Sequence, residues 1–237
     1  MGTVYQLALR QLTGKWRLVI MTVLASLPAI IAMLMMHASN APTVIEFETV
    51  VLSAMLAGSI VPLAVLAMAA AAFSNEVEDR TLANLTLSPL PRWQIAVPKL
   101  LAAITIAAPF VAISAFFTSY IAFLGDPKAV LAVTVAALVA VALYSAAFLW
   151  LGLITTYAIG IGLLYIVVWE GFFSGFVTGV RLLSIRHYAI ALMHGLDERR
   201  FALGDHLSFP GVVIVSIVLF GGFAFLSIRQ LRRMDVP

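Results

Sequence analysis

The longest polar stretch in the first half of the chain, residues 74–92, begins with a group of acidic side chains. Glu76, Glu78 and Asp79 follow a serine and an asparagine, and Arg80 comes next. Serine and asparagine are favoured just before the first turn of a helix, and acidic side chains within that turn are stabilised by the helix dipole. The order of residue types therefore predicts the start of a short helix.

The second part of this stretch supplies an apolar side and a stop. Leu82 and Leu85 are three residues apart, so they share one face of a helix. Pro89 and Pro91 then end the helix and stiffen the turn that follows. An ordinary loop with a solvated run of charges is the alternative interpretation. We expect an amphipathic helix that docks onto a partner protein through its apolar side.

A single carboxyl group, Glu170, closes an uncharged run that extends from residue 129 to residue 169. An ionisable group at membrane depth marks a functional site or is hydrogen-bonded by nearby backbone ends. We expect Glu170 to anchor the turn that follows it, with Arg181 or Arg186 as its partner.

Two other chemistries fit the sequence less well. Ser174 lies near Gly171, as in intramembrane serine proteases, but their Gly-x-Ser-Gly spacing is not met, and no histidine follows in the last apolar run. Met33 and His37 share a helical face and are ligands suited to copper, although an apolar helix end explains them more simply. We therefore predict no catalytic residue and no metal site.

Composition places the chain in a membrane. It is 63% hydrophobic and 11% charged, whereas soluble domains contain about 25% charged residues. The absence of cysteine excludes disulfides and cysteine-based metal or redox sites. The net charge of +3 comes from basic residues that flank apolar runs rather than forming a face of their own, so we expect no nucleic-acid partner.

Five runs without Asp, Glu, Lys or Arg define the expected membrane spans. A helix needs about 20 apolar residues to cross the hydrocarbon core. Four runs fit one helix each, whereas the run from 129 to 169 is long enough for two helices with a turn near Gly152–Thr156. We predict an all-α, polytopic membrane protein whose single domain, 1–237, has six transmembrane helices, at about residues 18–37, 50–73, 97–123, 130–150, 154–170 and 209–228.

The positions of Lys and Arg predict that both termini lie in the cytoplasm. Most basic residues then fall on the cytoplasmic side: Arg10, Lys15, Arg17, Arg80, Arg92, Lys99, Arg229, Arg232 and Arg233. An amphipathic surface helix is expected within residues 1–17, because one helical stripe contains Tyr5, Leu9, Leu12 and Trp16. Residues 171–208 are expected to form short re-entrant helices that dip into, or lie on, the outer leaflet.

The source of energy also follows from the charges. An ion-coupled secondary transporter usually places acidic or basic residues in mid-span. All charges of this sequence lie at the ends of the predicted spans or in loops. This favours energy supplied from outside the chain, with the ion-coupled transporter and the intramembrane serine-protease-like enzyme as alternatives.

Residues 76–100 carry a recognisable pattern. It reads Glu76-Val-Glu-Asp-Arg-Thr81-Leu82, Leu85, Ser88-Pro89-Leu-Pro-Arg92 and Lys99-Leu100. This pattern resembles the cytoplasmic loop of ABC transporter permeases of the type-2 exporter class, with Pro98 in place of the usual glycine before the lysine. Trp169-Glu170-Gly171, followed by residues 181–188, is similar to the segment after the fifth helix of that family.

The resemblance implies a transport subunit that is not itself an enzyme. In this family two permeases, here a second copy of this or a similar chain, pair with two separate ABC ATPase subunits in the cytoplasmic membrane, and the ATPases bind ATP and magnesium. This chain would bind no cofactor. The sequence agrees, because its Gly14-Lys15 pair is followed by Trp16 and a Walker A loop is absent. Apolar spans favour an amphipathic or lipid-like substrate.

The resemblance also assigns two groups of residues. The ATPase-coupling interface, a coupling helix between the second and third spans, would comprise Glu76, Glu78, Asp79, Arg80, Thr81, Leu82, Leu85, Pro89 and Arg92. The outer re-entrant segment would comprise Glu170, Arg181, Arg186 and Tyr188.

Overall fold

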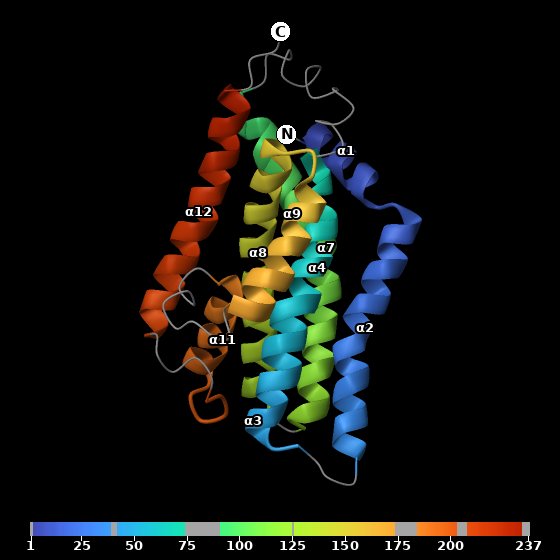
Figure 1. Ribbon diagram of the computed structural model, residues 1–237, viewed down its shortest axis with the longest axis vertical. Coiled ribbons are helices and arrows are strands. Elements are labelled where there is room, and N and C mark those ends of the chain that lie inside the picture. The colour runs from blue at the N-terminus through green and yellow to red at the C-terminus, as the bar shows by residue number, and fades with distance from the viewer. Residues whose placement is uncertain are drawn as a thin grey trace.

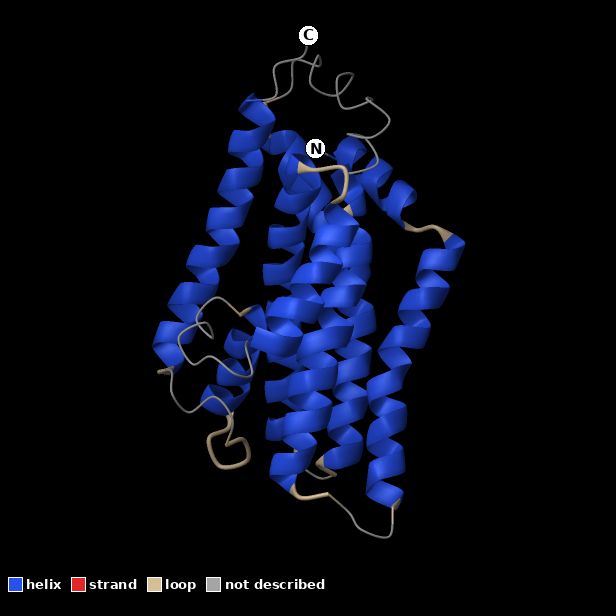
Figure 2. Cartoon of the chain, viewed as in Figure 1, coloured by secondary structure: helices blue, strands red, loops and turns tan. Residues whose placement is uncertain are grey.

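The computed structural model describes residues 2–38, 42–73, 91–124, 126–173, 184–202 and 208–233, and every regular element among them is helical (Figure 2). The prediction of an all-α protein is confirmed for these residues. The elements are α1 (Gly2–Leu12), α2 (Lys15–His37), α3 (Val44–Phe47), η1 (Glu48–Ile60), α4 (Val61–Ala69), α7 (Trp93–Ala122), α8 (Pro127–Ile154), α9 (Ala158–Leu164), η2 (Tyr165–Phe173), α11 (Ile185–Leu196) and α12 (Phe209–Arg233). The two η elements are π-helical.

Five of the described helices are long and apolar enough to cross a membrane, which indicates a membrane-embedded protein. They are Lys15–His37, Val44–Phe73, Trp93–Ala122, Pro127–Ile154 and Phe209–Arg233. Each overlaps a span predicted from the sequence. Most begin or end several residues beyond the prediction, because charged and aromatic side chains at their ends belong to the helix.

The remaining predicted span, 154–170, corresponds to the continuous helix formed by α9 and η2. The turn before it lies at Thr155–Tyr157, slightly later than Gly152–Thr156. Its apolar part, Ala158–Phe172, is ~22 Å long at about 1.5 Å per residue, less than the ~30 Å of a hydrocarbon core. This helix ends alongside α8 rather than at the far end of the bundle (Figure 1).

The long helices form a bundle in which α8 has the most central place. It packs against α4, α7, α11 and α12. Helices α2 and α12 flank the bundle, and α1, the start of α7 and the end of α12 lie at the end opposite to α3 (Figure 1). The outward faces of α2 and α12 are apolar and largely exposed, as lipid-facing helices require.

Helix α1 is separate from the first long helix, and its buried face is not quite the predicted stripe. Val4, Ala8 and Leu12 are buried, and the Tyr5 hydroxyl donates to Thr105 Oγ1 of α7 at 3.0 Å. Trp16 belongs to α2 and is 78% exposed, because the chain changes direction at Thr13 and Gly14. Helix α1 thus packs against α7 at one end of the bundle.

The close approach of α8 to the end of α4 generates a test of the packing. A Cβ atom at Gly152 would lie 2.6 Å from the carbonyl oxygen of Ala70, a backbone atom that cannot rotate away. We expect Gly152→Leu to lower the free energy of unfolding by about 1–3 kcal/mol. Thermal unfolding in detergent measures the effect.

The matched control is Gly160→Leu, because no atom lies within 4 Å of a Cβ at that glycine. We expect it to change stability by less than about 0.5 kcal/mol. Equal unfolding midpoints for the two variants would contradict the contact between α8 and α4.

Candidate functional site

The side chain of Glu170 is fully buried at the end of η2 and is the centre of a polar cluster. A π-helix repeats its backbone hydrogen bonds every five residues, so side chains five positions apart lie near one another. Tyr165 and Glu170 have this separation, and the Tyr165 hydroxyl donates to Glu170 Oε1 at 2.9 Å. The local helix geometry therefore supplies the first partner of the carboxyl group.

The other partners come from two further elements. The Tyr144 hydroxyl, from the second half of α8, donates to Glu170 Oε1 at 3.0 Å. The Ser184 hydroxyl donates to Oε2, and the backbone N–H of Ile185, at the start of α11, donates to Oε1 at 3.0 Å. One carboxyl group thus joins α8, η2 and the start of α11, and both of its oxygens accept hydrogen bonds.

Ser184 has a second role in this cluster. Its hydroxyl oxygen accepts a hydrogen bond from the N–H of His187 at 3.2 Å, which makes it the N-cap of α11. The same hydroxyl donates to Glu170. The start of α11 is therefore fixed directly by its cap and indirectly by the buried carboxyl group.

Arg186 ties the cluster to a fourth element. Its guanidinium Nη1 donates to the backbone carbonyl oxygen of Glu170 at 3.0 Å. A Cβ atom at Gly58 of η1 would lie 2.8 Å from Arg186 Cδ and 3.1 Å from Nη1. Arg186 therefore lies directly against the surface that glycine leaves open on η1.

The position of the cluster along the bundle follows from the helices that carry it. The first residue of α11, Ile185, lies beside the Glu170 carboxyl group. The 12 residues of α11 span ~18 Å, and Asp197, which follows them, contacts Lys128 at the start of α8. Tyr144 lies roughly 15 Å from the other end of α8, ten residues before Ile154. Glu170 thus lies deep in the bundle, although it stands near the end of the helix that α9 and η2 form.

Within the predicted outer re-entrant segment, the contact between Glu170 and an arginine differs from the one expected. Arg186 contacts the backbone carbonyl of Glu170 rather than its carboxyl group, and Arg181 lies outside the described residues. Tyr188 is buried, with 4% of its surface exposed. Helix α11 packs against α8, η1 and α12.

Sequence reasoning missed Tyr144, Tyr165 and Ser184. A signal was available for the two tyrosines, because both lie inside the uncharged run 129–169 and a buried tyrosine hydroxyl usually has a hydrogen-bond partner. Glu170 is the acidic residue that ends this run. Ser184 gave no comparable signal.

A second buried ionisable group, Lys99, lies near the start of α7. Lys99 is 2% exposed, its Nζ donates to the carbonyl oxygen of Ala72 at 2.6 Å, and Nζ lies 4.2 Å from the centre of the Phe73 ring. Ala72 and Phe73 directly precede the stretch 74–90. Lys99 therefore joins the two helices that flank the predicted coupling helix.

Of the predicted coupling interface, only Arg92 lies among the described residues, half-buried at the N-cap of α7. The rest lies outside them, as does Ser174 of the protease alternative: Glu76, Glu78, Asp79, Arg80, Thr81, Leu82, Leu85 and Pro89. His37 Nδ1 forms a hydrogen bond with the backbone carbonyl of Met33 at 2.8 Å. That bond gives the ring nitrogen a partner within its own helix.

Comparison of the chain with known protein families and with functionally characterised proteins finds no match. The function is therefore argued from the residues of this chain, above all from Lys99 and the stretch it adjoins and from the Glu170 cluster.

The cluster predicts a specific loss of stability. We expect Tyr144→Phe to lower the free energy of unfolding by about 1–3 kcal/mol, because it removes one buried hydrogen bond to the carboxyl group. The same change in a Glu170→Ala background should have a much smaller effect, since the partner is already gone. Unfolding in detergent of the four proteins of this cycle measures the coupling.

Tyr157→Phe is the matched control, because Tyr157 is 78% exposed. It should leave stability within about 0.5 kcal/mol of the wild type. An equal effect of Tyr144→Phe with and without Glu170 would contradict the cluster.

Proposed function

We propose that this chain is the transmembrane permease subunit of an ATP-binding-cassette exporter. It moves an amphipathic or lipid-like substrate outward across the cytoplasmic membrane, with both termini in the cytoplasm. Two copies of a separate ATPase subunit bind ATP and magnesium and hydrolyse the ATP. A second copy of this or a similar permease completes the transport path.

The observation that carries the proposal is the resemblance of residues 76–100 to the cytoplasmic loop of type-2 exporter permeases. An amphipathic helix ended by prolines suits a groove on a partner, whereas two spans need only a short connection. Five long apolar helices in the described residues are compatible with such a subunit.

The burial of Lys99 supports a mechanical role for this loop. Its Nζ joins the end of the helix Val44–Phe73 to α7 across the base of the loop. A force applied to the loop by a partner would therefore act on two helices together rather than on one. Helix α1, which lies at the same end of the bundle and packs on α7, would flank the docked ATPase (Figure 1).

The depth of Glu170 favours a second candidate, an ion-coupled secondary transporter. Ionisable groups at membrane depth are typical of proton relays in pumps and transporters. Against this, the carboxyl group of Glu170 is fully buried and holds three elements together through four hydrogen bonds. Transport that requires a proton gradient but no ATPase would favour this second candidate.

Purification of the tagged protein from its own host in mild detergent, followed by mass spectrometry, tests the ATPase partner. We expect a P-loop ATPase in stoichiometric amount, and we expect its loss when residues 76–88 are replaced by a Gly-Ser sequence. Recovery of the protein alone, together with no effect of the replacement, would overturn the proposal.

Single substitutions in the predicted coupling helix should separate ATP hydrolysis from transport. We expect Glu78→Ala, Arg80→Ala or Leu82→Ala to reduce transport about tenfold, the effect of losing one important contact at an interface. Membrane insertion should be unchanged. Glu198→Gln, in an exposed turn at the other end of the bundle, is the control. Normal transport by all three variants would remove the assignment.

A similar separation is expected when the base of the loop is weakened. Lys99→Met keeps the length of the side chain but removes the bond to the Ala72 carbonyl, worth about 1.5–3 kcal/mol for a charged donor. We expect the ATPase to remain bound while less substrate is transported per ATP hydrolysed. Lys15→Met, at an exposed lysine of α2, should behave as the wild type. If Lys99→Met transports as much substrate per ATP hydrolysed as the wild type, the mechanical role of Lys99 is excluded.

A further inference from the structure

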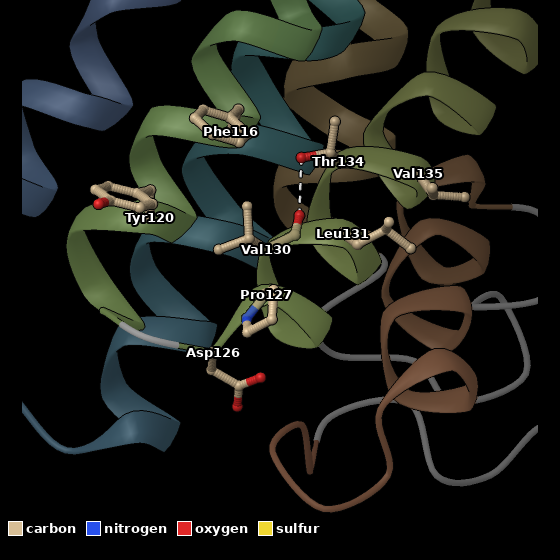
Figure 3. A pocket seen from close by; sticks show the side chains of 8 residues that line it. All are labelled: Phe116, Tyr120, Asp126, Pro127, Val130, Leu131, Thr134 and Val135. Atoms are coloured by element: carbon tan, nitrogen blue, oxygen red, sulfur yellow. Dashed lines mark hydrogen bonds between the residues drawn. The ribbon is translucent and has the colours of Figure 1, made fainter.

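An apolar groove runs between α7 and α8 near the end of the bundle that is opposite to α1. Its volume is about 470 Å³. Figure 3 shows its walls: Phe116 and Tyr120 from α7, with Val130, Leu131, Thr134 and Val135 from α8, and Asp126 and Pro127 at one end. The groove thus has a long apolar part and a single charged residue at its mouth.

A hydrogen bond within α8 and a stacked pair of aromatic rings make the walls of the groove apolar. The hydroxyl of Thr134 donates to the carbonyl oxygen of Val130 at 2.8 Å, the dashed line in Figure 3, so the helix itself satisfies this polar group. The rings of Phe116 and Tyr120 are stacked, with centres 5.9 Å apart and planes at 12°. Together they form a flat wall that suits an extended hydrocarbon chain.

The mouth of the groove opens onto a charged pocket of about 360 Å³, of which Asp126 is also a part. Its other members are Lys128, Asp197, Arg199 and Arg200. Positive groups therefore outnumber negative ones by one. Glu198, in the same turn of chain, does not line this pocket.

Two of the three cations are engaged by the two carboxylates. Arg200 donates to Asp126 Oδ2 through Nε at 3.2 Å and Nη2 at 2.9 Å. The Arg200 hydrogen bond holds the pKa of Asp126 below its usual value, so this pair stays charged at neutral pH. Lys128 Nζ lies 3.8 Å from Asp197 Oδ1, and its side chain is 66% exposed.

Arg199 is the cation that remains. It is exposed and forms no ion pair with the residues that the structure describes. A site that offers an apolar groove, a tyrosine near its mouth and an uncompensated guanidinium is complementary to a chain with an anionic head. Guanidinium groups bind phosphate well, and tyrosine is favoured at the membrane interface.

We propose that the groove between α7 and α8 binds one acyl chain of an anionic phospholipid, whose phosphate lies at Arg199. The continuity of the apolar groove with the charged pocket, through Asp126, argues for a lipid rather than for a second copy of the chain. A protein surface would have to match both an acyl-sized groove and a cationic rim. This site is independent of the proposed transport function.

Native mass spectrometry of the full chain in detergent tests the proposal. The delipidated protein is given equal amounts of phosphatidylglycerol and phosphatidylethanolamine with the same acyl chains. We expect preferential retention of phosphatidylglycerol. Arg199→Gln should reduce that retention about fivefold, the effect of one basic residue near an anionic surface, and should leave phosphatidylethanolamine unchanged.

A second variant tests the groove itself. Leu131→Trp, at a groove residue that is 60% exposed, should fill the groove and reduce retention of both lipids. Ile113→Trp is the matched control, because Ile113 is 58% exposed and lies on α7 outside the groove. This variant should retain both lipids. Equal retention of the two lipids by the wild type, or normal retention by Leu131→Trp, would overturn the proposal.

Discussion

Backbone groups at a helix end have no partner within the helix, and inside a membrane no water supplies one. Two of the buried charged side chains in the described part of the chain meet this need. Lys99 donates to the carbonyl of Ala72, at the end of a long helix. Glu170 accepts from the N–H of Ile185, where α11 begins. Charge is therefore placed where helices are interrupted.

This constraint explains why a carboxyl group stands at position 170. The helix of α9 and η2 is too short to cross a hydrocarbon core, so it ends among other helices, and α11 begins beside that end. A carboxyl group has two oxygens with about four acceptor sites, and here those oxygens receive three hydroxyl groups and one N–H group. Leaving such donors buried without an acceptor costs about 1–3 kcal/mol each. A side chain with this acceptor capacity therefore stabilises the place where one helix ends and another begins inside the bundle.

Hydropathy was sufficient to predict the long helices, because each must present about 20 apolar residues to lipid. It placed their ends less well. Helix α2 begins at Lys15 rather than at residue 18, since lysine, tryptophan and arginine can keep their polar ends at the interface while their backbone is helical. Helix α8 begins at Pro127 because Asp126 caps it. An aspartate followed by a proline is a typical start of a helix, so this boundary is indicated by the sequence itself.

The Glu170 cluster was predictable only in part. The sequence indicated that Glu170 anchors a turn, but its partner Tyr144 is 26 positions away on another helix. Which hydroxyl meets the carboxyl group depends on how α8 rotates against η2, and that is decided by packing. The small residues matter here: Gly58 leaves room for Arg186, and Gly152 lets α8 approach the end of α4. The presence of either glycine in the sequence does not show which residue packs against it.

The same contacts restrict how the bundle can move. Helices α4, α7 and α8 form the centre of the bundle, where backbone approaches backbone at Gly152 and a close-packed interior resists gradual deformation. Lys99 joins two of them at one end, and Glu170 joins α8 to η2 and α11 deep inside. Helices α2 and α12 are far less buried. Under the proposed function, a push at the coupling helix would therefore turn this centre as one body, and the path for substrate would open at the faces that α2 and α12 present rather than inside the bundle.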